Sequence, residues 1–192
     1  MWTGSLAMNN PLEILRTLDR HLPKPAELTL FGRAALALGY PDPPPDYGAT
    51  HDVDGIIPVT TAEPDTDFWL AQQATNAELK NRGLYITHLF SELDVILQPD
   101  WQPRCVPLRL GLEKLATRRP ATVDLVLTKM ARGDAQDMDD IRFLFSREPL
   151  RVEELQAAFA RARVPDVPEI LELFEAAQPK VLAIARTMPP KP

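Results

Sequence analysis

The chain contains 192 residues, of which 45% are hydrophobic and 25% are charged, as in an ordinary folded soluble domain. Its formal net charge of -6 excludes a surface that is basic throughout, so any contact with nucleic acid must come from a local patch. The single cysteine, Cys105, excludes an internal disulfide and a multi-cysteine zinc site. No apolar run has the length of a membrane span, and the N-terminus lacks the features of a signal peptide. We therefore expect a cytoplasmic protein that makes no contact with a membrane.

The N-terminal pattern predicts a helix, a short strand and a second helix. Pro11 opens the first helix and Pro23 ends it. Residues 27–31 then read as a strand, Gly32 follows, and residues 33–38 are helix-forming. A strand, a glycine and a helix in this order can aim backbone N–H groups at an anion. With only one glycine, a tight turn without a ligand is the alternative.

A pair of aspartates follows a proline-rich stretch. Residues 40–49 cannot form a helix or a central strand and are predicted to be a loop. The next predicted strand, residues 50–59, contains Asp52 and Asp54, which share one face because side chains alternate along a strand, while Val53 lies on the other. Two like charges so close repel each other unless a cation lies between them, and Mg²⁺ binds one or two carboxylates. The alternative is an edge-strand charge pair or a turn.

A third aspartate lies further along the chain. We predict a helix over residues 66–82, then strands over residues 84–90 and 93–98. Asp94 belongs to the second of these strands and shares a face with Ile96. A carboxylate on an apolar face costs free energy unless it is paired or bound to a metal. Asp94 is therefore a candidate site residue.

The pattern then changes from mixed to helical. Residues 99–107 are predicted to form a second proline-marked loop, which Trp101 is expected to anchor. Residues 108–115 fit a strand or a helix equally well. From residue 121 the chain is predicted to be helical to its end.

Two of these C-terminal helices carry charged pairs at helical spacing. Lys129 and Arg132 lie in the helix predicted over residues 123–132, and Asp137 and Asp140 lie in the next. Residues three apart share a helix face, so the turn between the helices brings the basic pair near the acidic pair. On spacing alone, an interhelical salt bridge with a solvated acidic face is the simpler interpretation.

The order of these motifs resembles the nucleotidyltransferase (DNA polymerase beta-like) superfamily. The run over residues 124–129, followed by Arg132 and residues 137–140, looks like the AbiEii-type nucleotidyltransferases, which include toxins of toxin–antitoxin systems. The resemblance covers residues 28–145.

The resemblance implies an α/β fold, with a small mixed β-sheet, flanking helices and a helical C-terminal half. We place the nucleotidyltransferase-like core at residues 11–118 and the helical region at residues 119–188. The two parts could also count as one domain.

The resemblance also implies a mechanism. In this superfamily a glycine loop holds the triphosphate of a nucleoside triphosphate, paired aspartates hold Mg²⁺, and a third carboxylate helps to activate the acceptor hydroxyl. The matching residues are Gly32 for the loop, Asp52, Asp54 and Asp94 for the metal and catalysis, Lys129 for a phosphate, and Asp137 for the helical motif. The acceptor in such relatives is RNA or protein, and an antitoxin protein is a further expected partner.

Two positions depart from the family pattern. The family has Gly-Gly or Gly-Ser where this chain has Gly32 followed by Arg33, so a serine hydroxyl is replaced by a guanidinium that could contact phosphate by charge. Relatives carry an arginine shortly before the aspartate pair, where only Thr50 is available here. These losses leave open a non-catalytic alternative, a nucleotide-binding or protein-interaction module on the same fold.

Overall fold

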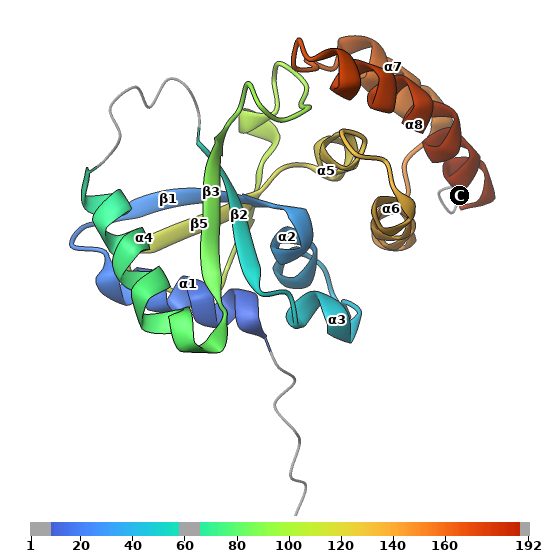
Figure 1. Ribbon diagram of the computed structural model, residues 1–192. Coiled ribbons are helices and arrows are strands. Elements are labelled where there is room, and N and C mark those ends of the chain that lie inside the picture. Colours follow the sequence, from blue (N-terminus) through green and yellow to red (C-terminus); the bar gives the residue numbers. More distant parts are fainter. Residues whose placement is uncertain (1–8, 58–65, 189–192) are drawn as a thin grey trace, which may run out of the picture.

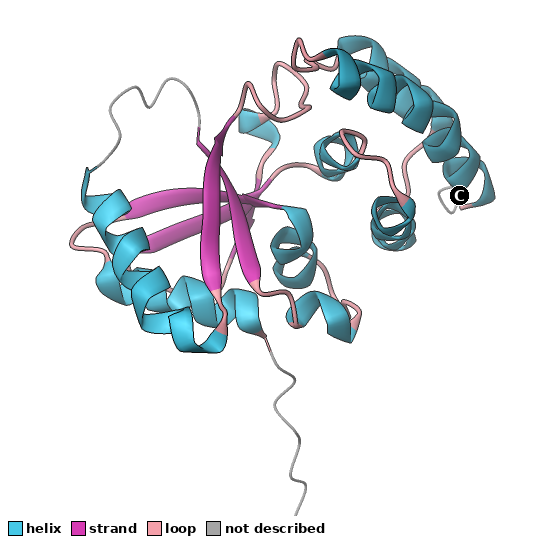
Figure 2. Cartoon of the chain, in the orientation of Figure 1, coloured by secondary structure: helices cyan, strands magenta, loops and turns pink. Residues whose placement is uncertain are grey.

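The computed structural model describes residues 9–57 and 66–188 (Figure 1). Helices and strands alternate in the first two thirds of the chain, and helices alone form the last third (Figure 2). In chain order the elements are α1 (Asn10–His21), β1 (Ala26–Phe31), α2 (Gly32–Gly39), α3 (Pro45–Gly48), β2 (Asp52–Ile57), α4 (Thr66–Leu79), η1 (Lys80–Arg82), β3 (Tyr85–Ser91), η2 (Gln102–Arg104), β4 (Val106–Leu108), β5 (Leu115–Arg119), α5 (Thr122–Lys129), α6 (Ala135–Arg147), α7 (Val152–Arg161) and α8 (Pro168–Thr187). The predicted α/β fold class is confirmed.

The five described strands form one mixed sheet in the order β3-β2-β1-β5-β4. The central strand β1 pairs antiparallel with β2 and parallel with β5. The outer pairs are β2 with β3, which are parallel, and β4 with β5, which are antiparallel. Helices α1 and α4 pack against each other beside β2 and β3, and α2 packs on β1 and β2 (Figure 1).

The N-terminal elements follow the sequence pattern closely. In α1 the Asn9 side chain accepts a hydrogen bond from the Leu12 N–H at 3.1 Å, which caps the helix. The prediction that residues 40–49 contain no helix is wrong, because α3 forms one turn there. Pro45 stands in the first turn of α3, where the missing N–H costs nothing and the fixed φ of proline suits a helix.

Side chains of α4 cover part of the outer edge of β3. The Asn76 amide accepts from the Ile86 N–H at 2.7 Å and donates to the Ile86 carbonyl at 3.0 Å. Gln72 donates to the Thr87 carbonyl at 2.9 Å. Edge strands expose unpaired backbone groups that invite pairing with another chain. At these two residues α4 satisfies those groups and fixes β3 in place.

The predicted strand over residues 93–98 is wrong. Asp94 lies in a turn, its N–H donates to the Ser91 carbonyl at 2.9 Å, and Leu97 alone makes a bridge, to Arg163. The apolar pattern arises because residues 95–97 are all buried, two of them in a small cluster around Trp101. The Trp101 Nε1–H donates to Glu92 at 2.9 Å, which confirms that this tryptophan anchors its loop.

The ambiguous stretch over residues 108–115 leads into β5 rather than a helix. The Asp19 carboxylate of α1 accepts hydrogen bonds from three backbone N–H groups, of Glu113 at 3.0 Å, Lys114 at 2.7 Å and Leu115 at 2.7 Å. These bonds hold the start of β5 beside β1. A contact between segments more than 90 residues apart thus sets the position of the strand.

A junction at the end of β5 ties the sheet to the C-terminal helices. The Arg119 guanidinium lies 4.1 Å above the Tyr40 ring and pairs with Glu148 at 2.8 Å. Its side chain packs so closely on Gly39 that a Cβ there would lie 2.5 Å from the Arg119 Cδ. Tyr40 also shares a hydrogen bond of 2.7 Å with Thr122, at the start of α5. One buried arginine therefore joins α2, β5 and α6.

One hydrophobic cluster extends through both parts of the chain. It contains Leu30 of β1, Leu127 of α5 and Val181 of α8, each completely buried. Helices α5 to α8 lie together on one side of the sheet (Figure 1). The division at residues 118 and 119 stays a prediction. Within the part of the chain that the structure describes, no helix is both long enough and apolar enough to cross a membrane.

Candidate active site

Strand β2 presents the two aspartates as the alternation of side chains predicts. Val53 points into the core and is completely buried, while Asp52 and Asp54 are half-buried on the opposite face. Each carboxylate has a threonine partner. The Thr50 hydroxyl donates to Asp52 Oδ1 at 2.8 Å, and the Thr87 hydroxyl of β3 is hydrogen-bonded to Asp54 Oδ1. These bonds orient the pair and leave further carboxylate oxygens for a ligand.

The electrostatic environment of Asp54 disfavours its charged form. Burial raises the pKa of the Asp54 carboxyl above its ordinary value, and the negative charge of Asp52 raises it further. The Thr87 hydrogen bond and the positive charges of Lys129 and Arg132 offset this only in part. A cation between the two carboxylates would remove the penalty, because opposite charge favours the ionised form.

Gly32 brings the N-terminus of α2 directly against Asp54. It has φ of +64°, a left-handed conformation that side chains other than glycine rarely adopt. A Cβ at this position would lie 2.8 Å from Asp54 Oδ2. The residue before it, Phe31, makes no side-chain cap, and the positive end of the α2 dipole lies at this N-terminus.

Lys129, at the end of α5, joins the aspartates of α6 to this region. Its ammonium lies 2.5 Å from Asp140 Oδ2 and 3.6 Å from Asp137 Oδ1, and all three residues are buried. The Arg132 guanidinium donates two hydrogen bonds of 2.9 Å to the Asp137 carboxylate. The predicted meeting of the basic and acidic pairs is therefore confirmed, but the expectation of a solvated acidic face is wrong, because Asp137 and Asp140 are buried. It is an interhelical ion pair whose positive charges also act on Asp54.

Arg33 points into the same ion-pair cluster. Its guanidinium lies 3.5 Å from Asp140, 3.4 Å from Asp46 and 5.1 Å from the centre of the Tyr47 ring. The Tyr47 hydroxyl is hydrogen-bonded to Asp140, and burial together with this bond raises its pKa, which keeps the hydroxyl protonated. Arg33 thus joins α2 to α3 and α6.

A comparison with models of protein families shows to which family the chain belongs. Residues 12–164 match the family described as a nucleotidyltransferase of unknown function, DUF6036. The chain belongs to this nucleotidyltransferase family. Neither the curated proteins nor the solved structures contain a match to the sequence or the fold. The family match covers the aspartate pair, Gly32 and the Lys129 cluster together.

The structure brings together most of the residues that the nucleotidyltransferase resemblance assigns. Thr50 is hydrogen-bonded to Asp52, and the negative charge of Asp52 acts on Asp54. Gly32 packs on Asp54, and the positive charge of Lys129 also acts on that carboxylate. Asp137 contacts Lys129. Arg33 lies next to Gly32, but its guanidinium is engaged by Asp140 and Asp46 instead of being free for a phosphate.

Asp94 is not part of this group. It lies in the exposed turn after β3, and among the side chains that the structure describes no three acidic, histidine or cysteine groups are placed to hold a metal. The expected set of Asp52, Asp54 and Asp94 is therefore not assembled. The cause is the end of β3 at Ser91, which removes the strand that was expected to carry Asp94.

Sequence reasoning missed Thr87 and underrated Asp140. Thr87 lies on β3 beside Asp54, and only the pairing of β2 with β3 reveals it. Asp140 is completely buried and faces Lys129, Arg33 and Tyr47. Asp140 shares the buried face of α6 with Ile141 and Leu144, and a carboxylate on that apolar face is a local signal that could have indicated it.

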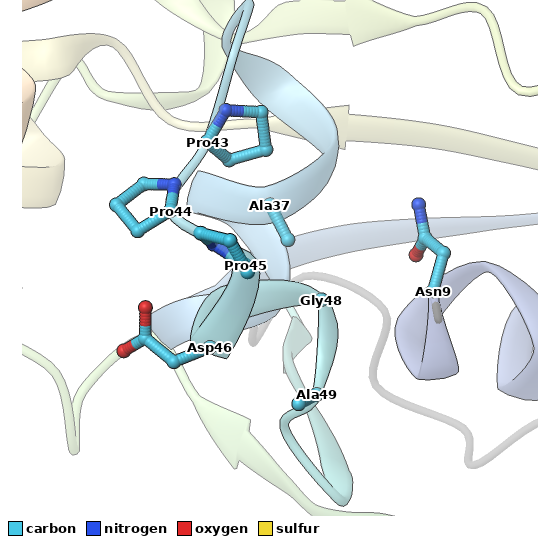
Figure 3. A pocket seen from close by; sticks show the side chains of 8 residues that line it. All are labelled: Asn9, Ala37, Pro43, Pro44, Pro45, Asp46, Gly48 and Ala49. Atoms are coloured by element: carbon cyan, nitrogen blue, oxygen red, sulfur yellow. The ribbon is translucent and has the colours of Figure 1, made fainter. Parts of the chain in front are cut away.

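A separate cavity lies between the loop before α3 and the start of α1. It has a volume of about 540 Å³ and is lined mainly by the ring faces of Pro43, Pro44 and Pro45, with Asn9 across from them (Figure 3). Asp46, the partner of Arg33, stands at its rim. None of its lining residues belongs to the aspartate site.

The donor set of the site fits Mg²⁺. This ion takes one or two carboxylates and completes its octahedral shell with water and phosphate oxygens. Asp52 and Asp54 supply such a pair, and the N-terminus of α2 beside them suits the phosphates.

Proposed function

We propose that this protein is a Mg²⁺-dependent nucleotidyltransferase that moves a nucleoside monophosphate from a nucleoside triphosphate to an RNA or protein acceptor. The observation that supports it best is the contact between Gly32 and Asp54. A helix N-terminus attracts phosphate, and a carboxylate repels it. A metal–triphosphate complex reconciles the two, because the cation binds the carboxylates while the N–H groups face the phosphates.

In the proposed reaction an acceptor hydroxyl attacks the α-phosphorus. The new O–P bond forms as the bond from the α-phosphorus to the bridging oxygen breaks, pyrophosphate leaves, and the hydroxyl proton passes to water. Bound Mg²⁺ would neutralise the charge that develops on the phosphate oxygens. Asp52 and Asp54, which are oriented by Thr50 and Thr87, would hold the cation. Lys129 adds a positive charge to the same site.

A labelling experiment tests the transfer. The purified protein is incubated with each labelled nucleoside triphosphate, Mg²⁺, and either total RNA or total protein. We expect one acceptor class to be labelled, and the label to disappear in the double variant Asp52→Asn plus Asp54→Asn. The matched control is Asp139→Asn, because Asp139 is an exposed aspartate of α6 that pairs with Arg142 on the same helix. Labelling that survives in the double variant would refute the assignment of the site.

A second candidate function is a binding module that has lost transfer activity. Two observations favour it: Arg33 is held by Asp140 and Asp46, and Asp94 is absent from the site. This candidate predicts that calorimetry detects triphosphate binding that Mg²⁺ strengthens, while no pyrophosphate is released on prolonged incubation. Any product of turnover eliminates it.

We extend the first proposal to a toxin whose activity is neutralised by an antitoxin protein. The support is the resemblance of residues 124–140 to the AbiEii-type proteins together with the family match. Induced expression in a bacterial host should then arrest growth, and the double asparagine variant should not. Normal growth with active, fully expressed protein would contradict this role.

A further inference from the structure

Thr87 lies on β3, the strand next to the aspartate pair of β2, and contacts Asp54. Strands β2 and β3 are parallel neighbours, with Val53 beside Ile86 and Gly55 beside Leu89. The irregular step between these pairs contains Asp54 on β2 and both Thr87 and His88 on β3. The Thr87 hydroxyl contacts Asp54 Oδ1 and also lies 2.9 Å from the Val53 carbonyl oxygen. Its side chain therefore fills the space on β3 that faces Asp54.

The acidic residues that follow β3 are occupied elsewhere. Glu92 is buried and accepts from Trp101 Nε1 at 2.9 Å and from Gln102 at 3.1 Å. Asp94 lies in the exposed turn. In the described part of the chain, the neighbour that β3 gives to Asp54 is thus a neutral hydroxyl.

We propose that Thr87 occupies the position of the third carboxylate, so that this chain holds its cation with two carboxylates and binds it weakly until a nucleotide arrives. This inference rests on the proposed function. Affinity for a divalent ion depends on the number and charge of its ligands. With two protein charges instead of three, phosphate oxygens complete both the coordination shell and the charge balance. The cation accordingly enters the site as its complex with the triphosphate.

Titration with Mn²⁺ alone, followed by calorimetry, tests the proposal without any measurement of activity. We compare the wild type with Thr87→Asp and with Thr87→Asn, which has the same shape without the charge. Thr87→Asp should bind Mn²⁺ about tenfold or more tightly than Thr87→Asn, because a third negative ligand is added. The wild type should resemble Thr87→Asn, and a non-hydrolysable triphosphate should tighten its Mn²⁺ binding by about tenfold.

Thermal melting provides a second readout and shows whether each variant folds. Without metal, Thr87→Asp should melt below the wild type, because a third like charge is added beside Asp52 and Asp54. Saturating Mn²⁺ should raise its melting temperature more than that of the wild type, since a ligand of the native state stabilises it in proportion to its affinity. If Thr87→Asp does not fold, Thr87→Glu replaces it in both measurements.

Two results would overturn the proposal. One is a folded Thr87→Asp with the same Mn²⁺ affinity as Thr87→Asn. The other is a wild type that binds Mn²⁺ without nucleotide as tightly as Thr87→Asp does. A wild type that binds no triphosphate at all would instead contradict the proposed function, and the comparison of the two Thr87 variants would still decide the ligand count.

Discussion

At the scale of single residues, Asp54 shows how the proposed binding site lowers the stability of the fold. Its carboxylate is half-buried, close to Asp52 and against Gly32, and these surroundings raise its pKa. A raised pKa in the folded state means that the ionised carboxylate destabilises the fold at neutral pH. Sites that bind ions commonly carry such a cost, which is removed when the ligand binds.

We predict that Asp54→Asn stabilises the protein while it weakens the site. The amide keeps the shape and can still accept from Thr87, but it carries no charge. The melting temperature at pH 7 should rise by about 2–4 °C, the shift that about 1 kcal/mol causes in a chain of this size. Lowering the pH protonates Asp54 in the wild type, so the difference between the two proteins should shrink as pH falls through the raised pKa.

The control for this prediction is Asp139→Asn, which removes an exposed charge and should change the melting temperature little. Calorimetry should show that Asp54→Asn loses Mn²⁺ binding in the presence of triphosphate. A melting temperature below that of the wild type at pH 7 would contradict this account of Asp54.

In the buried cluster of Lys129, Asp137 and Asp140, unlike at Asp54, opposite charges offset the cost of burial. Its charges are matched by short ion pairs and by the Tyr47 hydroxyl, so none of the three is left uncompensated. Removing one partner of a buried pair costs about 3–5 kcal/mol, because the other charge remains buried. Substitutions of Lys129 therefore test folding before they test phosphate binding.

At the scale of secondary structure, polar side chains from helices decide where two strands lie. Asn76 and Gln72 of α4 bond to the backbone of β3, and Asp19 of α1 accepts three backbone N–H groups at the start of β5. Burial raises the pKa of Asp19, but the hydrogen bonds from Glu113, Lys114 and Leu115 lower it more, so the pKa lies below its ordinary value.

We predict that Asp19→Asn destabilises the protein by about 2–3 kcal/mol at pH 7, since bonds to a charged acceptor are worth about 1.5–3 kcal/mol. A depressed pKa contributes stability that is fully present above the ordinary value of 3.8 and is lost as pH falls through the folded value. The difference between variant and wild type should therefore shrink below about pH 4. Urea denaturation at pH 7 and at pH 3 measures it. An equal difference at both values would contradict the role of the charge.

The elements also show which sequence patterns are reliable. Helix α1, strand β1 and the glycine at the start of α2 agree with prediction because a cap, a proline or a glycine within a few residues specifies each of them. The strand predicted from Leu93 to Gln98 was wrong, because consecutive buried residues in an anchored loop give the same apolar pattern as a buried strand. Strand β5 was missed because its position depends on β1 and Asp19.

At the scale of the whole molecule, the sheet and the C-terminal helices share one core. Leu30, Leu127 and Val181 belong to the same cluster, and Arg119 joins β5 to Tyr40 and Glu148. A bridge between Leu97 and Arg163 adds a further link. Burial shared between two parts of a chain makes each depend on the other for stability.

We predict a single cooperative unfolding transition. Far-UV circular dichroism follows the helices, and tryptophan fluorescence follows the part of the chain before residue 119, where Trp2, Trp69 and the buried Trp101 all lie. Because the core is continuous, the two signals should share one midpoint in urea. Two separate midpoints would instead support independent domains at residues 11–118 and 119–188.

The sequence by itself determined the features that depend on neighbouring residues: the face shared by Asp52 and Asp54, the turn at Gly32 between a strand and a helix, and the meeting of Lys129 with Asp137 across a short turn. Only the tertiary structure decided that Thr87 faces Asp54, that Arg33 turns to Asp140, and that Asp94 lies outside the site. The physical reason is that strand pairing and helix packing join residues far apart in the chain. Local periodicity carries no information about which of those residues will be neighbours.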